Sequence, residues 1–346
     1  MYKKCILIDS VYINSGGGEF ILNLVIKDLK KKRLINKCFF LLDSRLNLEN
    51  LSVKLNSNYI LLNPSENKRK IFYKKYYNFM SAVVCLANIP PPIRVLNPVK
   101  IFFHNDLFLD PLKSNLKLKN KILNFFKKKY IINRNDESYD WFVQTDLMAK
   151  NINKKLLINK EKINVTPIFL NKKNKLKKKH INSFIYVANS SDHKNHERLL
   201  KSFILSAKII DKRIQLNLTL PKPFFLNSTY SKYDIPVNLE IVNHGTLKYK
   251  DLEKVYEKSN FLIFPSLNES FGLPLIESIN NNCQVLASDL PYVYEIVRPS
   301  LVFNPFSVKS ISEKIIQALS QDNLDKSRII IENKIDTFVK HIIHNV

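Results

Sequence analysis

The chain has 346 residues, 45% of them hydrophobic, with 55 lysines and arginines against 30 aspartates and glutamates, a formal net charge of +25. This length suits two cores of about 150 to 170 residues, and the hydrophobic share excludes wholesale disorder. No apolar stretch reaches the ~20 residues that span a bilayer. The N-terminal apolar run ends at Asp9, before any signal-peptide cleavage site, so we expect a cytoplasmic protein.

The positive charge has two explanations that the sequence leaves open. Only nine of the basic residues are arginine, and the chain is also rich in Asn, Ile, Phe and Tyr, a combination that AT-rich codons produce. The alternative is attraction to an anionic surface. Few arginines argue against nucleic acid, because bidentate contacts favour the guanidinium group. The four cysteines are scattered, so neither a zinc site nor a disulfide framework is expected.

In the first half, short apolar runs alternate with helical segments, which is typical of parallel sheets covered by helices. The longest run, 82–87, stops at three consecutive prolines, 90–92. Strands are predicted at 4–9, 37–43, 57–61, 99–104, 140–144 and 162–165, and helices at 18–31, 67–79, 115–133 and 146–155. The lysine- and asparagine-rich stretch 171–180 is the predicted linker. Residues 1–170 are therefore predicted to form a Rossmann-like domain.

The same pattern then restarts. Strands are predicted at 183–188, 214–219, 238–241, 261–264 and 284–287, and helices at 194–208, 249–258, 271–280, 307–319 and 323–343. We predict a second Rossmann-like domain at 171–322 and a C-terminal helix at 323–346 that packs back towards the first domain. Two doubly wound α/β domains facing a cleft would bind a ligand at the carboxyl ends of both sheets.

The five glycines all follow predicted strands, at Gly16, Gly17, Gly18, Gly245 and Gly272. A chain with so little glycine is expected to keep it where the backbone needs positive φ or where a ligand approaches closely. The run 16–18 also opens a helix, where free amides favour an anion such as a sugar diphosphate. The run is not GxGxxG, and a flexible turn is the alternative.

Two glutamates lie within a predicted strand–turn–helix segment at 261–277. Glu269 lies in the turn, Gly272 permits a tight backbone path, and Glu277 comes about two helical turns later. A carboxylate at Glu277 could accept both vicinal hydroxyls of a ribose, and one at Glu269 could hold a sugar hydroxyl. For a bare pair of glutamates, a solvated helix surface would be the better explanation.

These residues resemble a known family. Pro265-Ser266, Glu269-Ser270-Phe271-Gly272-Leu273-Pro274 and Glu277 are similar to the E-x7-E signature of the group 1 (family 4) retaining glycosyltransferases, which have the GT-B fold and include enzymes of bacterial surface-polysaccharide synthesis. Upstream, Lys194-Asn195 and Asn243-His244-Gly245 resemble the family's diphosphate lysine and base-covering turn. Gly16–Gly18, Asn88–Pro91 and Phe102–Asn105 resemble its glycine-rich loop and the region of its active-site histidine.

The resemblance implies retaining, metal-independent transfer of a hexosyl group from a UDP-, GDP- or dTDP-hexose to a hydroxyl of a lipid-linked or polysaccharide acceptor. The product would be surface polysaccharide such as O-antigen, capsule or lipopolysaccharide, and no cofactor would be needed. The catalytic residues implied are Glu269, His104 and Lys194. Donor binding would use Gly17, Gly18, Asn189, Lys194, His244, Gly245, Ser270, Phe271, Gly272, Leu273 and Glu277.

The chain also departs from the family pattern. Asn189 stands where a basic residue is common, and Asn282 and Gln284 stand near positions that usually hold glycine and proline. His193 and His196, which flank Lys194, are expected to be solvated. The departures are expected to change stability or donor preference.

Lys113–Arg134 interleaves basic and apolar residues, a pattern suited to an anionic bilayer surface, and 68–79 repeats the mixture. Family members that act on lipid-linked acceptors dock their first domain on membranes, so peripheral contact with the inner face of the cytoplasmic membrane is expected. An ordinary surface helix is the alternative.

Three other functions stay open. One is a nucleotide-sugar epimerase or hydrolase of the same fold, which would turn over donor without acceptor. Another is a non-catalytic basic protein that binds membrane or nucleic acid. The last is a degenerate family member that scaffolds a polysaccharide assembly complex. The sequence indicates neither the donor sugar nor the oligomeric state.

Overall fold

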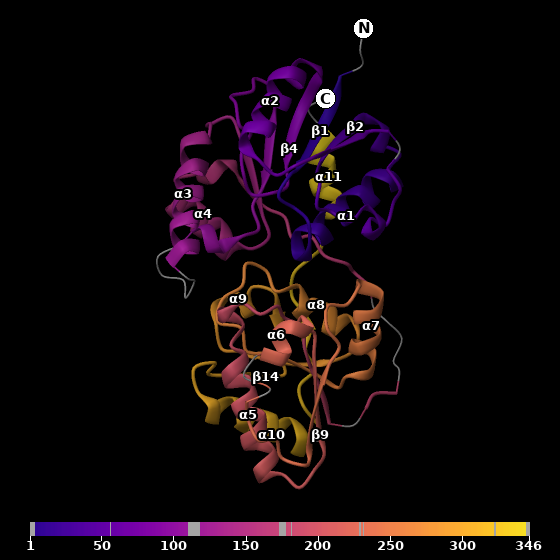
Figure 1. Cartoon of the computed structure of the whole chain (residues 1–346), viewed down its shortest axis with the longest axis vertical. Coiled ribbons are helices and arrows are strands. Elements are labelled where there is room, and N and C mark those ends of the chain that lie inside the picture. Colours follow the sequence, from indigo (N-terminus) through magenta and orange to yellow (C-terminus); the bar gives the residue numbers. More distant parts are fainter. Residues whose placement is uncertain are drawn as a thin grey trace. The chain divides into compact units, whose positions relative to one another are not determined.

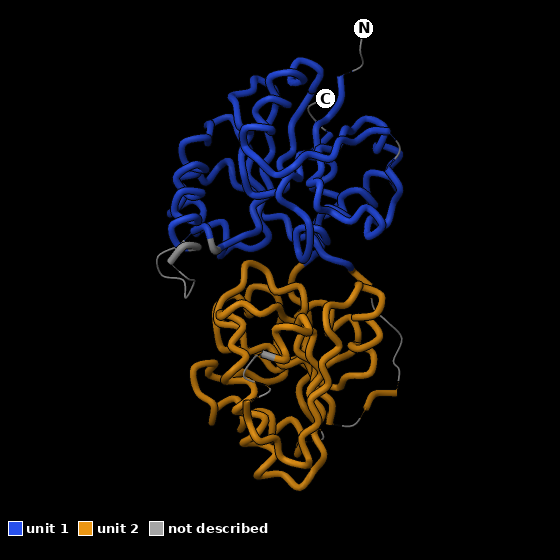
Figure 2. Tube along the Cα trace, in the orientation of Figure 1, with its two compact units in different colours: residues 1–170, 332–346 blue, residues 171–331 orange. Residues whose placement is uncertain are grey.

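The computed structural model describes residues 4–55, 57–109, 118–172, 178–180, 182–227, 230, 232–321 and 323–343. The chain forms two compact units, one of residues 1–170 with 332–346 and the other of residues 171–331 (Figure 2). Each unit is an α/β structure around its own parallel sheet, so the prediction of two Rossmann-like domains is confirmed.

The first unit is built on a seven-stranded parallel sheet with the order β3-β2-β1-β4-β5-β6-β7 (Figure 1). Its strands are β1 Cys5–Ser10, β2 Cys38–Asp43, β3 Tyr59–Leu62, β4 Met80–Cys85, β5 Val99–Phe102, β6 Asp140–Val143 and β7 Ile163–Val165. Its helices are α1 Gly16–Lys31, α2 Glu66–Tyr76, α3 Leu118–Arg134, α4 Asp146–Leu156 and α11 Ile335–Ile343. The chain order reverses between β1 and β4, which is the switch point where such sheets bind ligands.

Both faces of this sheet are buried, as expected for parallel strands covered by helices. Alternate residues of each strand point to opposite faces. Ile6 and Ile8 of β1 therefore join one core cluster with α1 and α11, whereas Leu7 joins the other with α2, α3 and α4. The packing holds the carboxyl ends of β1, β4 and β5 at one edge, where the loops with Gly16–Gly18, Asn88 and His104 begin.

The C-terminal helix is shorter than predicted. The structure has no helix at residues 323–334 among those it describes. Arg328–Ile329 forms β15, an antiparallel pair with Val297–Arg298 (β13), and the helix α11 begins only at Ile335. Three consecutive isoleucines at 329–331 favour extended backbone over helix. The Asn333 side chain then accepts a hydrogen bond from the Ile335 amide at 3.1 Å and caps the helix.

Helix α11 packs within the first unit, against α1. Phe338 lies edge-on to Phe102 of β5 and Phe142 of β6, with ring centroids 5.2 and 5.1 Å apart. At the surface, Lys32 pairs with Asp336 at 2.6 Å. The last turns of the chain thus complete the apolar layer on the α1 face.

The second unit has a six-stranded parallel sheet of order β10-β9-β8-β11-β12-β14 (Figure 1). Its strands are β8 Ser183–Tyr186, β9 Ile214–Leu218, β10 Leu239–Asn243, β11 Phe261–Phe264, β12 Gln284–Ser288 and β14 Leu301–Phe303. Its helices are α5 His196–Ile209, α6 Lys222–Asn227, α7 Tyr249–Lys258, α8 Leu273–Asn280, α9 Pro291–Tyr294 and α10 Val308–Ser320. The switch point here lies between β8 and β11.

The central strand β4 was not among the predicted strands, although its second part, residues 82–85, belongs to the apolar run at 82–87. It pairs with β1 on one side and β5 on the other. A short apolar run that is buried on both faces has no alternating pattern, so its periodicity does not mark it as a strand. Half of the predicted linker, residues 173–177, lies outside the described residues.

Candidate functional site

An ion pair spans the switch point of the second sheet. Lys194 follows β8 and Glu269 follows β11, and the Lys194 Nζ lies 2.5 Å from a Glu269 carboxylate oxygen. The two side chains keep 13% and 12% of their surface exposed. The pair is therefore largely withdrawn from water while both groups keep an exposed edge for a ligand.

The backbone that carries Lys194 is fixed by its neighbours. Lys194 ends a short 3₁₀ helix, Asp192–Lys194, and Asn195 follows in the left-handed conformation with φ +61°. The Tyr186 hydroxyl donates to the Lys194 carbonyl at 2.6 Å. The buried side-chain amide of Asn195 donates to the carbonyls of Pro265 and Pro305 at 3.2 and 2.8 Å. It therefore ties this turn to the loop that carries Glu269. Such supporting contacts hold a charged group in one position.

Gly272 lets the Glu269 loop turn sharply into α8. Its φ is +76°, and a Cβ placed there would lie 3.1 Å from Leu275 Cδ1, so both backbone and space favour glycine. Phe271 is buried, and Ser270 and Leu273 are partly exposed beside it. Leu273 opens α8, Pro274 after it has no N–H, and the Leu275 amide donates to the Gly272 carbonyl at 3.0 Å. Of the first three residues of the helix, Leu273 is therefore the one whose amide can be offered to a ligand.

Glu277 lies on α8, where the Tyr256 hydroxyl of α7 donates to its carboxylate at 3.1 Å. The residue keeps some exposed surface, but burial of the carboxyl group raises its pKa to about 7 and the Tyr256 hydrogen bond opposes the rise. Glu277 is thus a carboxyl group that changes charge near neutral pH.

The remaining donor-site candidates of the second unit are less enclosed. His244 is exposed, and its Nε2 donates to the Asn217 side chain at 2.8 Å. Gly245 has φ +70° with no atom within 4 Å of an added Cβ, so backbone conformation alone favours glycine there. Asn189 is exposed, and its side chain accepts from the Ser191 amide at 3.1 Å.

In the first unit the glycine run 16–18 forms the first turn of α1, and the structure brings it to His104. A Cβ at Gly18 would lie 3.4 Å from His104 Cε1, whereas one at Gly17 would meet nothing within 4 Å. The His104 Nε2 lies 3.1 Å from the Leu86 carbonyl, which fixes the proton on that nitrogen, and the Asn88 side chain accepts from the His104 amide at 2.6 Å. Burial lowers the pKa of His104 to about 4, so the ring is neutral at pH 7.

The expectation that His196 is solvated is wrong. Its ring packs among Tyr186, Phe224 and Tyr230, and its Nε2 donates to the Asn189 carbonyl at 2.7 Å. Burial lowers its pKa to about 4. His196 therefore supports the turn around Lys194 as a neutral ring.

Asn282 and Gln284, two of the residues that depart from the family pattern, have defined local conformations and contacts. Asn282 has φ +58°, a conformation that glycine adopts freely and asparagine tolerates. Gln284 begins β12, and its side-chain oxygen accepts from the Ser300 hydroxyl and the Ser327 amide at 2.7 and 3.0 Å. Gln284 thus ties the start of β12 to the segments at 300 and 327, and the Asn282 amide donates to the Ile279 carbonyl of α8 at 2.9 Å.

Sequence reasoning missed the residues that hold the site in place. Tyr256 and Tyr186 each donate a hydroxyl to the segments that carry Glu277 and Lys194. In the first unit, Asn88 has φ +68° and binds His104. Asn88 lies in the segment 88–91 that was matched to the family's histidine region, but its contact with His104 was not predicted; asparagine just after an apolar run and before prolines favours a turn.

Neither a metal-binding cluster nor a membrane-spanning helix occurs in the part of the chain that the structure describes. No group of three or more His, Cys, Asp or Glu side chains there is arranged to hold a metal ion. Within the same described ranges, no helix combines the length and the apolar character needed to span a membrane. Of the four cysteines, Cys38, Cys85 and Cys283 are buried as expected, and Cys5 is partly exposed.

Residues 168–336 match the family described as glycosyl transferases group 1. The O-antigen chain mannosyltransferase RfbU of Salmonella typhimurium is 30% identical over 171 residues, which are 48% of this chain and 45% of that protein, so the chain matches less than half of this relative's length.

Two solved structures share the fold over both units. WaaG, a glycosyltransferase involved in lipopolysaccharide biosynthesis, has a TM-score of 0.67 at 13% identity, covering 91% of this chain and 90% of its own. Anabaena HepE, solved with UDP and glucose, has a TM-score of 0.68 at 11% identity, covering 92% and 90%. With these neighbours, the GT-B assignment of the fold is confirmed.

Proposed function

Since residues 168–336 place this chain in the group 1 glycosyltransferase family, we propose that it transfers a hexosyl group from a nucleotide sugar to a hydroxyl of a lipid-linked or polysaccharide acceptor. The observation that carries the proposal is the Lys194–Glu269 pair beside the Gly272 turn, at the ligand-binding edge of the second sheet. The relationship to RfbU favours mannose as the hexose and O-antigen-type surface polysaccharide as the product.

The second unit would bind the donor. A diphosphate seated at the start of α8 would gain a hydrogen bond from the Leu273 amide and a charge partner in Lys194. Negative charge grows on the diphosphate as the glycosidic bond breaks, and a fixed ammonium group stabilises that charge most in a site withdrawn from water. Lys194 would then exchange its contact with Glu269 for the phosphate, which frees the Glu269 carboxylate to accept a sugar hydroxyl.

The rest of the donor would be held by groups nearby. Glu277, in its carboxylate form, would accept both ribose hydroxyls, with Tyr256 fixing its orientation. The exposed His244–Gly245 turn would lie over the base. In the first unit, neutral His104 and the Gly17–Gly18 segment are proposed to take part in the transfer reaction. We expect retention at the anomeric carbon and no metal requirement, because the E-x7-E segment resembles the family that reacts in this way.

Helix α3 is proposed to contact an anionic membrane. Its outer face exposes Ile122, Leu123, Phe125 and Phe126, with Phe126 63% exposed, and lysines 127 and 129 are exposed on the same helix. Apolar side chains among lysines are typical of helices that lie at a bilayer surface. Lys113 and Lys117, at the start of the expected basic segment, lie outside the described residues.

Sedimentation with vesicles tests this contact. The double change Phe125→Ser and Phe126→Ser should weaken binding to phosphatidylglycerol-containing vesicles about tenfold or more, and added salt should weaken the wild type. Phe306→Ser is the matched control, because Phe306 is 60% exposed in the second unit. Equal binding by all three proteins would contradict the assignment to α3.

A thermal-shift screen tests the donor site. UDP, GDP, dTDP and their hexoses are added to the full chain, because a ligand that binds the folded state raises the melting temperature by mass action. We expect one nucleotide class to stabilise the wild type and Lys194→Ala to remove that shift. If no nucleotide diphosphate shifts the melting temperature at saturation, the donor site proposed here does not exist.

The epimerase or hydrolase alternative predicts a different result. Such an enzyme would consume donor in the absence of acceptor at its full rate. A transferase should consume donor rapidly only after a lipid extract with acceptor is added. Nuclear magnetic resonance of the product would report the anomeric configuration and so test retention.

A further inference from the structure

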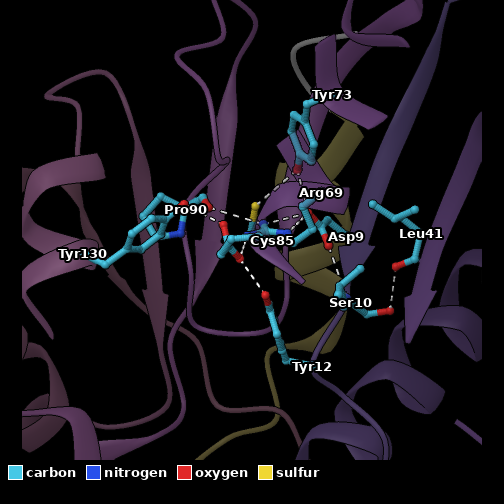
Figure 3. Close-up of polar contacts among 11 residues, drawn as sticks. Asp9, Ser10, Tyr12, Leu41, Arg69, Tyr73, Cys85, Pro90 and Tyr130 are labelled. Atoms are coloured by element: carbon cyan, nitrogen blue, oxygen red, sulfur yellow. Dashed lines mark hydrogen bonds and ion pairs between the residues drawn. The ribbon is translucent and has the colours of Figure 1, made fainter. Parts of the chain in front are cut away.

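A cluster of polar groups at the ligand-binding edge of the first sheet belongs to none of the roles above. Its lower layer is buried. Asp9 accepts two hydrogen bonds from Arg69, at 3.1 and 2.8 Å, and a third from the Tyr73 hydroxyl at 2.7 Å (Figure 3). The Val11 amide adds a fourth at 3.2 Å. Asp9 is 1% exposed, so a ligand cannot reach its carboxylate.

The upper layer reaches the surface around Glu66, the first residue of α2. One carboxylate oxygen accepts from Arg69 at 2.7 Å and from the Tyr12 hydroxyl at 2.9 Å. The other accepts from the Tyr130 hydroxyl of α3 at 2.6 Å. The Glu66 side chain is 35% exposed, and Tyr12 and Tyr130 are partly exposed. The two Glu66 oxygens and the two tyrosine hydroxyls therefore form a partly exposed cluster next to the buried layer.

The direction of these hydrogen bonds decides what the partly exposed cluster can bind. Each tyrosine hydroxyl has one proton, and each proton is already donated to Glu66. Burial, together with the adjacent Glu66, raises the pKa of both tyrosines, which keeps these protons in place. The lone pairs left on Tyr12, Tyr130 and Glu66 can only accept. A ligand here must bring donors.

The charged groups near the cluster limit further the class of ligand that it can bind. Two carboxylates, Asp9 and Glu66, lie in the cluster with Arg69, and the Arg134 guanidinium lies 5.7 Å from the Tyr130 ring centroid, so the charges of these four groups cancel. Phosphate and carboxylate groups would meet oxygen atoms that have no proton left to donate. Organic cations would be repelled over longer range by a chain of net charge +25. A neutral polyhydroxyl compound satisfies both constraints.

The cluster is built into the same edge as His104. Arg69 also donates to the Pro90 carbonyl at 3.3 Å, in the loop whose Asn88 binds the His104 amide. Tyr12 follows β1 with φ +84°, and its amide donates to Asp43 at 3.0 Å while its hydroxyl reaches Glu66. A strained residue that is held at both ends is common at binding sites.

We infer that Tyr12, Glu66 and Tyr130 form a recognition site for the hydroxyl groups of a neutral sugar, which is the acceptor end of the proposed transfer reaction. The inference rests on the proposed function for the identity of the sugar as acceptor. It makes Tyr12 and Tyr130 specificity residues that discriminate neutral from anionic glycans.

The test measures sugar binding to the full chain by saturation-transfer nuclear magnetic resonance. The probes are the methyl glycosides of mannose, glucose, galactose and N-acetylglucosamine, with mannose 6-phosphate and glucuronate as anionic comparisons. We expect at least one neutral glycoside to bind saturably and about tenfold more tightly than either anion. Tyr12→Phe and Tyr130→Phe should each weaken that binding about tenfold, whereas Tyr77→Phe in the same unit should not.

Three results would overturn the inference: no neutral glycoside binds, the two variants bind as tightly as the wild type, or the anions bind as well as the neutral sugars. The wild-type preference needs no variant, so poor folding of a variant does not block the test. The nucleotide thermal shift is measured on the same samples. If nucleotides bind and glycosides fail these criteria, only the acceptor site is wrong. If no nucleotide binds, the transferase proposal itself fails.

Discussion

The two sheet edges are built on the same topology but use their charges in opposite ways. In the first unit, Asp9 and Arg69 are 1% and 2% exposed and bind each other and their neighbours. In the second unit, Lys194 and Glu269 bind each other but keep an exposed edge. The first pair is part of the core, whereas the second pair is available to a ligand. A charged pair at a switch point is therefore not functional by virtue of its position alone.

The largest expected effect on stability comes from breaking the buried pair. Arg69→Met leaves Asp9 charged and without its cation in the core, and we expect a loss of about 3–5 kcal/mol in the free energy of unfolding. Urea denaturation of the full chain, followed by tryptophan fluorescence from Trp141 in the first unit, measures it. A loss below about 1 kcal/mol would show that the two pairs do not differ as described.

The same kind of substitution in the second unit should act on function instead. Lys194→Met should lower the transfer rate about 10²–10³-fold, because the departing diphosphate loses its cation. The cost to stability should not exceed about 2 kcal/mol, since water can reach the Glu269 left behind. Rates from radiolabelled donor, compared with denaturation of the same protein, separate the two effects. A folded variant with normal activity would contradict the role of Lys194.

The pH dependence of donor binding sharpens the comparison further. Burial raises the pKa of Glu277 to about 7, so the carboxylate needed for ribose binding is lost as pH falls through that value. The KM for donor should therefore rise below about pH 7. Tyr256→Phe removes a hydrogen bond to the carboxylate and should move this midpoint to higher pH. A midpoint that stays in place would show that Tyr256 does not stabilise the carboxylate.

The raised pKa of Glu277 also makes the free energy of unfolding depend on pH. Folded Glu277 holds its proton between the ordinary pKa of about 4.5 and about 7, where the unfolded chain has released it. Its contribution to stability is present below about pH 4.5 and is lost as pH rises through 7. Glu277→Gln should remove this pH dependence, measured by urea denaturation across that range.

The smallest effect is expected from the glycines. Gly272→Ala places a Cβ 3.1 Å from Leu275 at φ +76° and should cost about 1–2 kcal/mol. Gly17→Ala is the matched control, because an added Cβ meets no atom within 4 Å and the position lies in α1, where alanine is favoured by about 0.5–1 kcal/mol. Thermal denaturation compares them. Equal stabilities would mean that the Gly272 turn is not constrained.

The sequence predicted the fold well where its signals are local. Alternating apolar runs placed most strands, and glycines after strands placed the turns at Gly16, Gly245 and Gly272, all of which have positive φ. The helix expected at 323–334 failed because the isoleucines at 329–331 favour extended backbone and Arg328–Ile329 pairs with residues 297–298. The Asp9–Arg69 and Glu277–Tyr256 contacts join residues 60 and 21 positions apart, so no local pattern indicates them.

The most direct test of the account is transfer itself. The full chain is incubated with GDP-mannose, or with the nucleotide hexose that the thermal-shift screen selects, and a lipid extract, and the lipid products are analysed by mass spectrometry. The account predicts that wild-type protein adds one hexosyl residue to a lipid-linked glycan and that Glu269→Gln and Lys194→Met add it at least 10²-fold more slowly. Equal product from wild type and both variants would contradict a donor site built on this pair.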